Sequence, residues 1–297
     1  MLKKIKTLCF ISFQYLIPQH TLSRLIGKLA SSRNIFIKNL LIQLAIRKFK
    51  INLSDSLISD PKKFKTFNDF FTRQLKPGAR NFPKNKNNLN NPEKIISPAD
   101  GVISQLGKIQ AGRIFQAKKH FFNLLELLGS QNAQENYDTY QNGQFMTIYL
   151  APKDYHRVHM PLSGRLLAYR HIPGDLFSVN QITAENIPNL FARNERVCFF
   201  FEDLDKKPFI LVMVGALLVA SIGTSFTGII NPKKSKTIST QKLDQPLLFN
   251  QGDELGFFQF GSTVIILFPE RENLDLNFEF NLKPGSDIQC GMPLQAS

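Results

Sequence analysis

The 297-residue sequence contains no tryptophan and only three cysteines, Cys9, Cys198 and Cys290. These cysteines are widely spaced and odd in number, so they match neither a disulfide framework nor the ligand spacing of a zinc site. Hydrophobic residues still make up 43% of the chain, enough for the core of one large domain or one to two ordinary ones. We therefore expect a folded protein that does not depend on disulfides, as is typical of a reducing compartment.

Acidic residues are absent from the N-terminal segment, where Asp55 is the first aspartate or glutamate. Residues 1–50 carry +10 of the formal charge of +14, through Lys3, Lys4, Lys6, Arg24, Lys28, Arg33, Lys38, Arg47, Lys48 and Lys50. Such a leader suits nucleic acid or an anionic membrane. Its basic residues are interleaved with Leu, Ile and Phe rather than clustered with Gly or Ser, which favours the membrane surface.

Hydrophobic runs long enough to cross a bilayer are also missing. Residues 5–17 follow a lysine-rich start and are similar to a signal peptide, but Gln14 and Pro18 interrupt the run and no small-x-small cleavage site follows. Residues 208–232 contain no charge, yet their strongly apolar part, 209–222, is only 14 residues long. A spanning helix needs about 20 residues, so we expect neither export nor a membrane span here, and interpret 208–232 as two buried strands and a turn.

Residues 35–50 have the pattern of an amphipathic helix. Asn39, Gln43, Arg47 and Lys50 share one face, and Phe36, Ile37, Leu40, Leu41, Leu44 and Ile46 occupy the rest. The uncharged stretch from 39 to 46 is too short to span hydrocarbon, so we expect this helix to lie in the membrane interface. The alternative is an ordinary amphipathic helix packed on its own domain.

The rest of the chain predicts an α+β fold with a largely antiparallel β core. Residues 67–73 predict a short amphipathic helix, and 119–129 a second helix. Residues rich in Val, Ile and Phe predict strands at 146–151, 197–201, 209–214 and 264–268. We divide the chain into an amphipathic helical membrane-association region at 1–75, a Pro-, Asn- and Lys-rich linker at 76–94, and a β-rich catalytic domain at 95–297.

Three residues in separate segments suit the chemistry of an activated nucleophile. Ser262 follows Gly261 at the mouth of the predicted strand, Asp100 lies in a Pro-Ala-Asp-Gly turn, and His159 lies three residues after His156. A histidine can accept the serine proton while an aspartate orients the imidazole and stabilises its cation. Each feature also has another explanation. Gly261-Ser262 can be an ordinary turn, and Asp100 can be present because aspartate is common in turns. His156 and His159 can bind a metal ion, although the sequence suggests no third Cys or His ligand nearby.

Seven motifs, in order, resemble the phosphatidylserine decarboxylases, and most closely their bacterial membrane-bound branch. They are Phe-Asn-Asp-Phe-Phe at 67–71, Ser-Pro-Ala-Asp-Gly at 97–101, Gln-Ala-Lys at 116–118, Tyr-His-Arg-Val-His-Met-Pro at 155–161, Pro-Gly-Asp-Leu-Phe-Ser-Val-Asn at 173–180, Asn-Leu-Phe-Ala-Arg-Asn-Glu-Arg at 189–196 and Phe-Gly-Ser-Thr at 260–263. Each motif alone is weak, but together, in this order and spacing, they are specific, and they are spread over most of the chain, from residue 67 to residue 263.

The resemblance implies a carboxy-lyase that cleaves its own chain between Gly261 and Ser262 and converts Ser262 to a covalent pyruvoyl group, without metal or pyridoxal phosphate. Asp100, His159 and Ser262 correspond to the self-cleavage machinery. The pyruvoyl group forms a Schiff base with phosphatidylserine, and loss of CO2 yields phosphatidylethanolamine. We assign His156 as the proton donor, and His156 with Ser178 as substrate-binding residues.

The resemblance also implies how the protein is assembled and where it acts. Chains 1–261 and 262–297 remain together as a heterodimer through burial of 264–268, and heterodimers can pair further. The substrate lies in an anionic membrane and no nucleic acid takes part. We expect a peripheral protein on the cytoplasmic face of the inner membrane, docked through its N-terminal helices.

The sequence departs from the family pattern at two places. Phe260 replaces the usual leucine before the glycine, and Leu217, Leu218 and Ala220 make the run 214–222 more apolar; we expect adjusted packing and unchanged chemistry.

Two other classes of function stay open. A membrane-associated serine hydrolase would use the same three residues but lacks a Gly-x-Ser-x-Gly elbow. A non-enzymatic membrane or nucleic-acid binder would explain the basic leader alone.

Overall fold

The computed structural model describes residues 2–82, 94–130, 137–217, 221–230, 235–259, 261–270 and 282–294. Phe260, Leu218, Ala220 and most of the predicted linker therefore lie outside the described residues, and the expectations for them stay predictions. The domain limits at 75 and 94 likewise remain a proposal.

Five short helices form the N-terminal region: α1 (Leu2–Leu16), α2 (Gln19–Ala30), α3 (Ile35–Phe49), the 3₁₀ helix η1 (Pro61–Lys63) and α4 (Phe67–Phe71). Pro18 separates α1 from α2. Asn34 begins α3 because its side chain accepts hydrogen bonds from the backbone N–H groups of Phe36 and Ile37. The predicted helix at 35–50 is confirmed, and the one at 67–73 is confirmed with an earlier end.

A small aromatic core joins α2, α3 and α4. Phe64, Phe67, Phe70 and Phe71 pack with Ala30, Ile42 and Ala45. On the outside of α3, Phe36, Leu40 and Leu44 are 85%, 58% and 53% exposed. Lys38 differs from its basic neighbours because it is buried, and its Nζ donates to the carbonyl of Lys62 at 2.8 Å. Lys38 is thus a structural residue and cannot be one of the lipid-facing charges.

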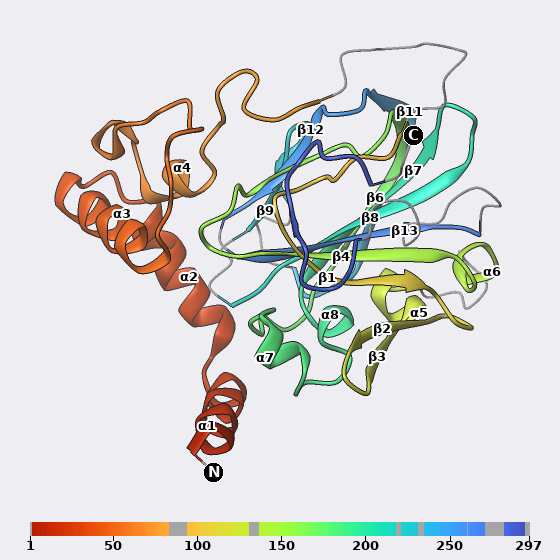
Figure 1. The fold of residues 1–297 in the computed structure, drawn as a ribbon, viewed down its shortest axis with the longest axis horizontal. Helices are drawn as coiled ribbons and strands as arrows, with labels where there is room; N and C mark the ends of the chain where they lie inside the picture. The colour runs from red at the N-terminus through yellow and green to blue at the C-terminus, as the bar shows by residue number, and fades with distance from the viewer. Residues whose placement is uncertain are drawn as a thin grey trace.

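The centre of the fold is an eight-stranded sheet in the order β11-β6-β7-β8-β13-β4-β1-β14 (Figure 1). Its strands are β1 (Gly101–Lys108), β4 (Gln144–Leu150), β6 (Gly164–Ile172), β7 (Arg196–Asp203), β8 (Pro208–Val214), β11 (Ser239–Phe249), β13 (Ser262–Phe268) and β14 (Asp287–Ile288). Every pairing in it is antiparallel. The predicted α+β class with an antiparallel core is confirmed.

A second sheet in the order β10-β9-β12-β5 packs against one face of the first. It contains β5 (Arg157–His159), β9 (Ile222–Thr224), β10 (Gly228–Ile229) and β12 (Glu254–Phe258). Val264, Ile266 and Phe268 of β13 share the core between the sheets with Val158 and Phe258. This follows from the period of two in a strand, which directs alternate side chains to one face.

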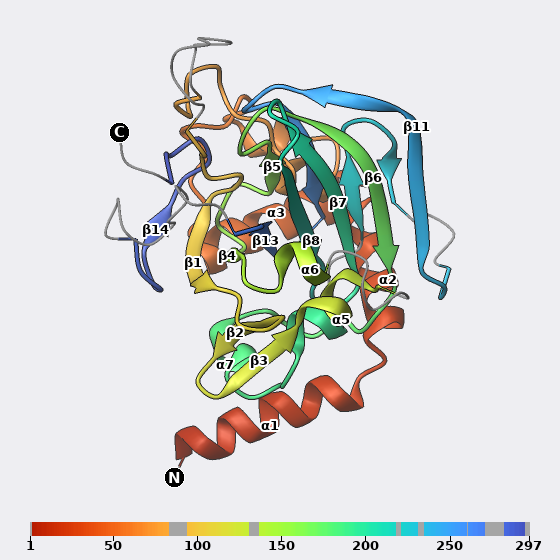
Figure 2. The ribbon, with the colours of Figure 1, turned by 90° about the vertical axis from the view of Figure 1, so that its right-hand side faces the viewer.

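The opposite face of the large sheet is covered by small elements, and α1 lies on the outer side of these elements (Figure 2). These elements are β2 (Arg113–Ala117), β3 (His120–Asn123), α5 (Leu124–Leu128), α6 (Tyr137–Tyr140), α7 (Gln181–Ala184) and α8 (Leu190–Arg193). Ile265 and Leu267 of β13 belong to this second core. The predicted helix at 119–129 is wrong over 120–123, because those residues pair with β2, and Asn123 then caps α5.

The described part of the uncharged segment 208–232 contains β8, β9 and β10, so the predicted strands are confirmed and the short strand β10 is one more than the two that we expected. Among the described residues, no helix combines the length and apolarity that a bilayer crossing requires.

Candidate functional site

Ser262 is the first residue of the central strand β13. Its neighbours across the sheet are Leu150 of β4 and, one residue later, Val214 of β8 opposite Thr263. The side chain is completely buried, and its Oγ has no hydrogen-bond partner in the described part of the chain. A buried hydroxyl without a partner is costly. The hydroxyls of Thr147 and Thr263 are also buried without a partner among the described residues, so what distinguishes Ser262 is that it also follows a glycine at the start of the central strand. Gly261 precedes it in roomy surroundings, since an added Cβ would meet only the Leu150 carbonyl at 3.8 Å.

Asp100 is held in a network that sequence spacing did not indicate. Its Oδ1 accepts from Arg80 Nε at 2.9 Å and from the backbone N–H of Cys290 at 2.8 Å, and its Oδ2 pairs with Arg80 Nη2. Arg80 also bonds Asp55 at 3.1 Å. The hydrogen bond to Asp100 raises the pKa of Arg80, and the one from Arg80 lowers the pKa of Asp55. Arg80 therefore connects the N-terminal region to the Pro98–Asp100 turn.

His159 lies beside that turn, because its backbone N–H donates to the carbonyl of Pro98 at 2.8 Å. Its ring Nδ1 lies 2.8 Å from the carbonyl of Gly252, and Nε2 lies 2.9 Å from the hydroxyl of Tyr155. A carbonyl only accepts, so the proton is on Nδ1, and Nε2 accepts from the Tyr155 O–H. Burial lowers the pKa of His159, whereas the hydrogen bond to the Gly252 carbonyl and the charges of Glu254 and, less strongly, Asp100 act in the opposite direction.

A cavity of 300 Å³ opens next to His159. Residues 74–78, Arg80 and Phe82 form one side, and Tyr155, His159 and Glu254 form the other. The cavity thus lies between the end of the N-terminal region and the small sheet, where it gives His159 the opening that Ser262 lacks.

His156, which directly precedes β5, occupies a different environment from His159 at the end of that strand. It is fully buried, stacks on Phe71 with ring centroids 4.2 Å apart, and donates from Nε2 to the carbonyl of Ala151 at 3.1 Å. Burial lowers its pKa to about 3. Nδ1 is then an unprotonated, buried acceptor without a partner among the described residues. In this state Nδ1 must first take up a proton before it can donate one to another group.

The structure therefore brings the predicted residues into one region without joining them directly. Within the described part of the chain, no hydrogen bond links any two of Asp100, His159 and Ser262. His156 is connected to Ser262 through the backbone, since Ala151, its acceptor, follows Leu150, the partner of Ser262.

Ser178 lies in a segment that is attached to the same end of β13. The side-chain oxygen of Asn194 accepts from the N–H of Phe177 at 3.1 Å. Its Nδ2 donates to the carbonyl of Phe177 at 2.8 Å and to the carbonyl of Gly215 at 2.9 Å. Gly215 follows Val214, which pairs with Thr263. Gly174 begins the segment where a Cβ would come within 2.2 Å of the Arg193 carbonyl, so only glycine fits.

Sequence reasoning missed Arg80, Tyr155 and Asn194. Tyr155 and Asn194 lie inside motifs that drew attention to other residues, so their positions were available as a signal. Arg80 lies in an ordinary Pro-Gly-Ala-Arg turn, and nothing in the sequence indicates its partner 20 residues away.

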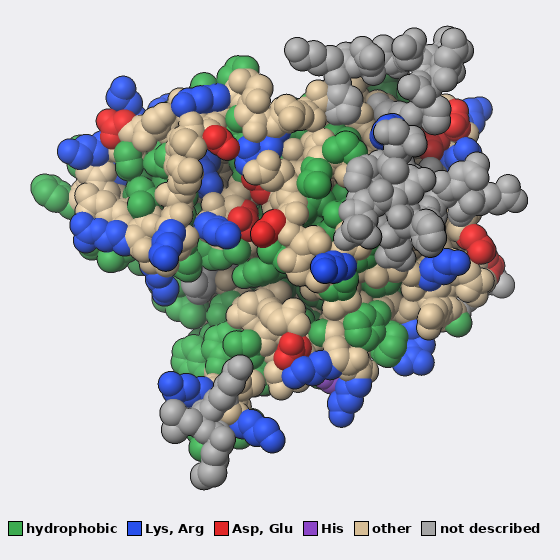
Figure 3. All heavy atoms as spheres, in the orientation of Figure 1, with side chains coloured by type: hydrophobic (Ala, Val, Ile, Leu, Met, Phe, Trp, Pro, Cys, Tyr) green, Lys and Arg blue, Asp and Glu red, His purple; other side chains and the backbone are tan. Residues whose placement is uncertain are grey.

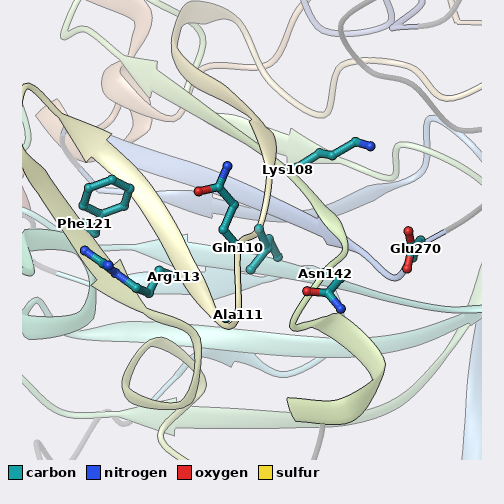
Figure 4. A pocket seen from close by; sticks show the side chains of 8 residues that line it. Lys108, Gln110, Ala111, Arg113, Phe121, Asn142 and Glu270 are labelled. Atoms are coloured by element: carbon teal, nitrogen blue, oxygen red, sulfur yellow. The ribbon is translucent and has the colours of Figure 1, made fainter.

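The described residues contain no cluster of three or more His, Cys, Asp or Glu side chains that could hold a metal ion. A larger cavity of 440 Å³ lies elsewhere, lined by Lys108, Ile109, Gln110, Ala111, Arg113, Phe121, Asn142 and Glu270 (Figure 4). None of the predicted site residues lines it, and its Arg113 lies over the ring of Phe121 at 4.5 Å.

Comparison with known proteins agrees with the family resemblance of the seven sequence motifs. A family model described as phosphatidylserine decarboxylase matches residues 67–296, and one described as PSD matches residues 9–50. The chain is 48% identical over 282 residues to the phosphatidylserine decarboxylase proenzyme of Alcanivorax borkumensis, covering 94% of this chain and 93% of that protein. Its identity to the proenzyme of Pseudomonas fluorescens is 46% over 297 residues, 99% of each chain. The proenzyme of Shewanella amazonensis is 44% identical over 287 residues, 95% of this chain and 96% of its own.

Proposed function

Since the chain belongs to the phosphatidylserine decarboxylase family, and is thus a carboxy-lyase made as a proenzyme, we propose that it cleaves itself between Gly261 and Ser262 and converts phosphatidylserine to phosphatidylethanolamine and CO2. The observation that carries the proposal is the buried Ser262 Oγ, which has no hydrogen-bond partner among the described residues and follows a glycine at the start of the central strand. A hydroxyl that donates to no other group can donate to a general base and then attack the preceding carbonyl.

The cleavage begins when Ser262 Oγ attacks the carbonyl carbon of Gly261 and the C–N bond breaks, which leaves an ester and a free amine at residue 262. Removal of the α-proton then breaks the Cβ–Oγ bond and releases Gly261 as a carboxylate. The dehydroalanine that remains becomes an imine, and water converts it to a ketone with loss of ammonia. Residue 262 is then a pyruvoyl group at the start of a chain of residues 262–297.

We propose that His159 accepts the Ser262 proton at Nε2, the ring atom that now accepts from Tyr155, while Gly252 holds the Nδ1 proton. The charge of Asp100 favours protonated His159, as do the Gly252 carbonyl and Glu254 to a greater extent, and Arg80 holds the Asp100 carboxylate in place. Taking up the serine proton requires His159 to leave Tyr155. The buried Tyr155 hydroxyl, whose pKa is raised by burial, keeps its own proton during this exchange.

The surroundings of residue 262 fit a pyruvoyl group, because a ketone oxygen needs no hydrogen-bond acceptor and would replace the unpaired hydroxyl in a buried, largely apolar environment. Such a group supplies a carbonyl that takes up the electron pair left when a carboxylate departs as CO2. His156 is connected to this region through Ala151, which follows the partner of Ser262, and its Nδ1 has no partner among the described residues; we therefore assign it to hold and return the proton that completes the reaction. Ser178 is assigned to the substrate.

After cleavage, residues 1–261 and 262–297 stay together as a heterodimer. The support for this is the position of β13, which pairs with β4 on one side and β8 on the other and is buried along its length. Two heterodimers can pair further, and the mass of the processed protein in solution tests this pairing.

The substrate is a membrane lipid, so we place the protein on the cytoplasmic face of the inner membrane as a peripheral protein. The support is the combination of exposed apolar side chains on α1–α3 with exposed basic ones. In Figure 3 both kinds of side chain gather over α3 and α1. Two weak signals of this kind together give stable attachment without a spanning helix.

The experiment is a denaturing gel of the purified protein with intact-mass analysis of both fragments. We expect chains 1–261 and 262–297, the second with a mass that shows loss of ammonia. One intact band that reacts with a fluorophosphonate at Ser262 would instead establish a serine hydrolase.

A further inference from the structure

Two glutamines of the N-terminal helices bind the backbone of the segment that contains Ser178. Gln14, in α1, is completely buried, and its Oε1 accepts from the N–H of Ser178 at 2.8 Å. Its Nε2 donates to Thr183 Oγ1 at 3.3 Å. Gln19, at the start of α2, accepts from the N–H of Leu176 at 2.6 Å and donates to the Gln14 carbonyl at 2.8 Å. Both amides therefore satisfy donors of the segment 176–178.

An aromatic contact reinforces this connection. The ring of Tyr15 meets the ring of Phe177 edge-on, with centroids 4.9 Å apart. The guanidinium of Arg193 lies over both rings, 4.8 Å from Phe177 and 5.6 Å from Tyr15, and pairs with Asp175 at 3.0 Å. Figures 1 and 2 agree in placing α1 next to α7, the helix that follows this segment.

A completely buried glutamine is unusual in a helix whose other side chains are mostly apolar. Burying an amide costs free energy unless its hydrogen bonds are made, and here they are made with the segment rather than within α1. Other faces of the same helix expose Leu8, Phe13 and Leu16, which are 67%, 55% and 83% exposed. One helix thus holds the segment on one side and offers apolar side chains to a bilayer on the other.

We infer that α1 and the start of α2 complete the substrate site, with Gln14 and Gln19 acting as positioning residues for the backbone of 176–178. The inference rests on the proposed function, since that function assigns Ser178 to the substrate. Membrane attachment and pocket geometry then depend on the same helix, and the segment is correctly placed only when α1 is docked.

The test measures kcat and KM on a dissolved short-chain phosphatidylserine, without vesicles, for the wild type, Gln14→Leu, Gln14→Glu and Gln241→Leu. Gln241 lies exposed on β11 and is the matched control for the same chemical change. We expect Gln14→Leu to lower kcat/KM by about tenfold or more, because the Ser178 N–H loses its acceptor. Gln14→Glu keeps the acceptor and should retain more activity. Self-cleavage and binding to vesicles should equal those of the control.

Two results would overturn the inference. One is an unchanged kcat/KM for Gln14→Leu, and the other is a loss confined to substrate in vesicles, which would limit Gln14 to membrane attachment. If Gln14→Leu does not fold, Gln19→Leu is measured in the same way. This variant loses the bonds of Gln19 to Leu176 and to the Gln14 carbonyl, and unchanged kinetics in it would also overturn the inference. Failure of the proposed function is separately visible, because the wild type and Gln241→Leu would then be uncut or inactive.

Discussion

The basic residues at the end of α3 provide a quantitative test of membrane attachment. Eight of the nine leader cations whose side chains are described are exposed, and Lys38 is the exception. We therefore change Arg47, Lys48 and Lys50 to Gln and leave Lys38 intact. Each cation near an anionic surface contributes about 1 kcal/mol. Removing three should weaken binding by about 3 kcal/mol, on the order of a hundredfold at low salt.

The assay is flotation with neutral and anionic vesicles over a range of salt concentrations. The control changes Lys119, Lys206 and Lys242 to Gln, which removes the same charge from exposed positions outside the N-terminal helices. Because salt screens exposed charges beyond about 8 Å at physiological strength, the difference between the two triple variants should shrink as salt rises.

Decarboxylation should fall with binding on vesicle substrate, and it should change little on a dissolved short-chain substrate. The electrostatic argument fails if the wild type binds neutral and anionic vesicles equally at every salt concentration. It also fails if the control triple variant loses as much binding as the α3 variant.

Four further predictions concern the site. Ser262→Ala should remain one uncut, inactive chain on a denaturing gel, and Ser262→Cys should cut slowly; two fragments from Ser262→Ala would mean that the cut lies elsewhere. Asp100→Asn and His159→Ala should each accumulate uncut chain in a time course, and normal processing of both would remove them from the mechanism. Hydroxylamine, or borohydride with substrate, should abolish activity of the mature enzyme while added pyridoxal phosphate has no effect; the opposite pattern would exclude a pyruvoyl group. Because the folded-state pKa of His156 is about 3 and the unfolded one about 6.5, the unfolded chain binds more protons between these values. In the uncut Ser262→Ala background, this histidine should lower the free energy of unfolding by up to about 1.4 kcal/mol per pH unit below pH 6.5. His156→Phe should remove that contribution in denaturant titrations, and identical pH profiles with and without His156 would contradict the burial argument.

Local patterns in the sequence were sufficient for the elements that contain the site. The β-branched run after Ser262 predicts a buried strand because such side chains fit a pleated, covered surface wherever they occur. The spacing of polar residues in α3 likewise predicts its exposed apolar face. Residues 119–129 show where this reasoning stops. His120–Asn123 form a strand because β2 is their partner, and no property of those four residues identifies that partner.

The sequence by itself determined the α+β class, the buried strands around the site, the amphipathic helix α3, and the motifs that this chain shares with its relatives. Only the tertiary structure decided which of those residues meet. Arg80 holds Asp100, Lys38 is bound inside the helical core, and Gln14 reaches the N–H of Ser178 across 164 residues. Side-chain periodicity reports whether a position faces an apolar or a polar environment. A hydrogen bond between distant positions depends instead on which elements pack together, and that is set by the free energy of the whole fold.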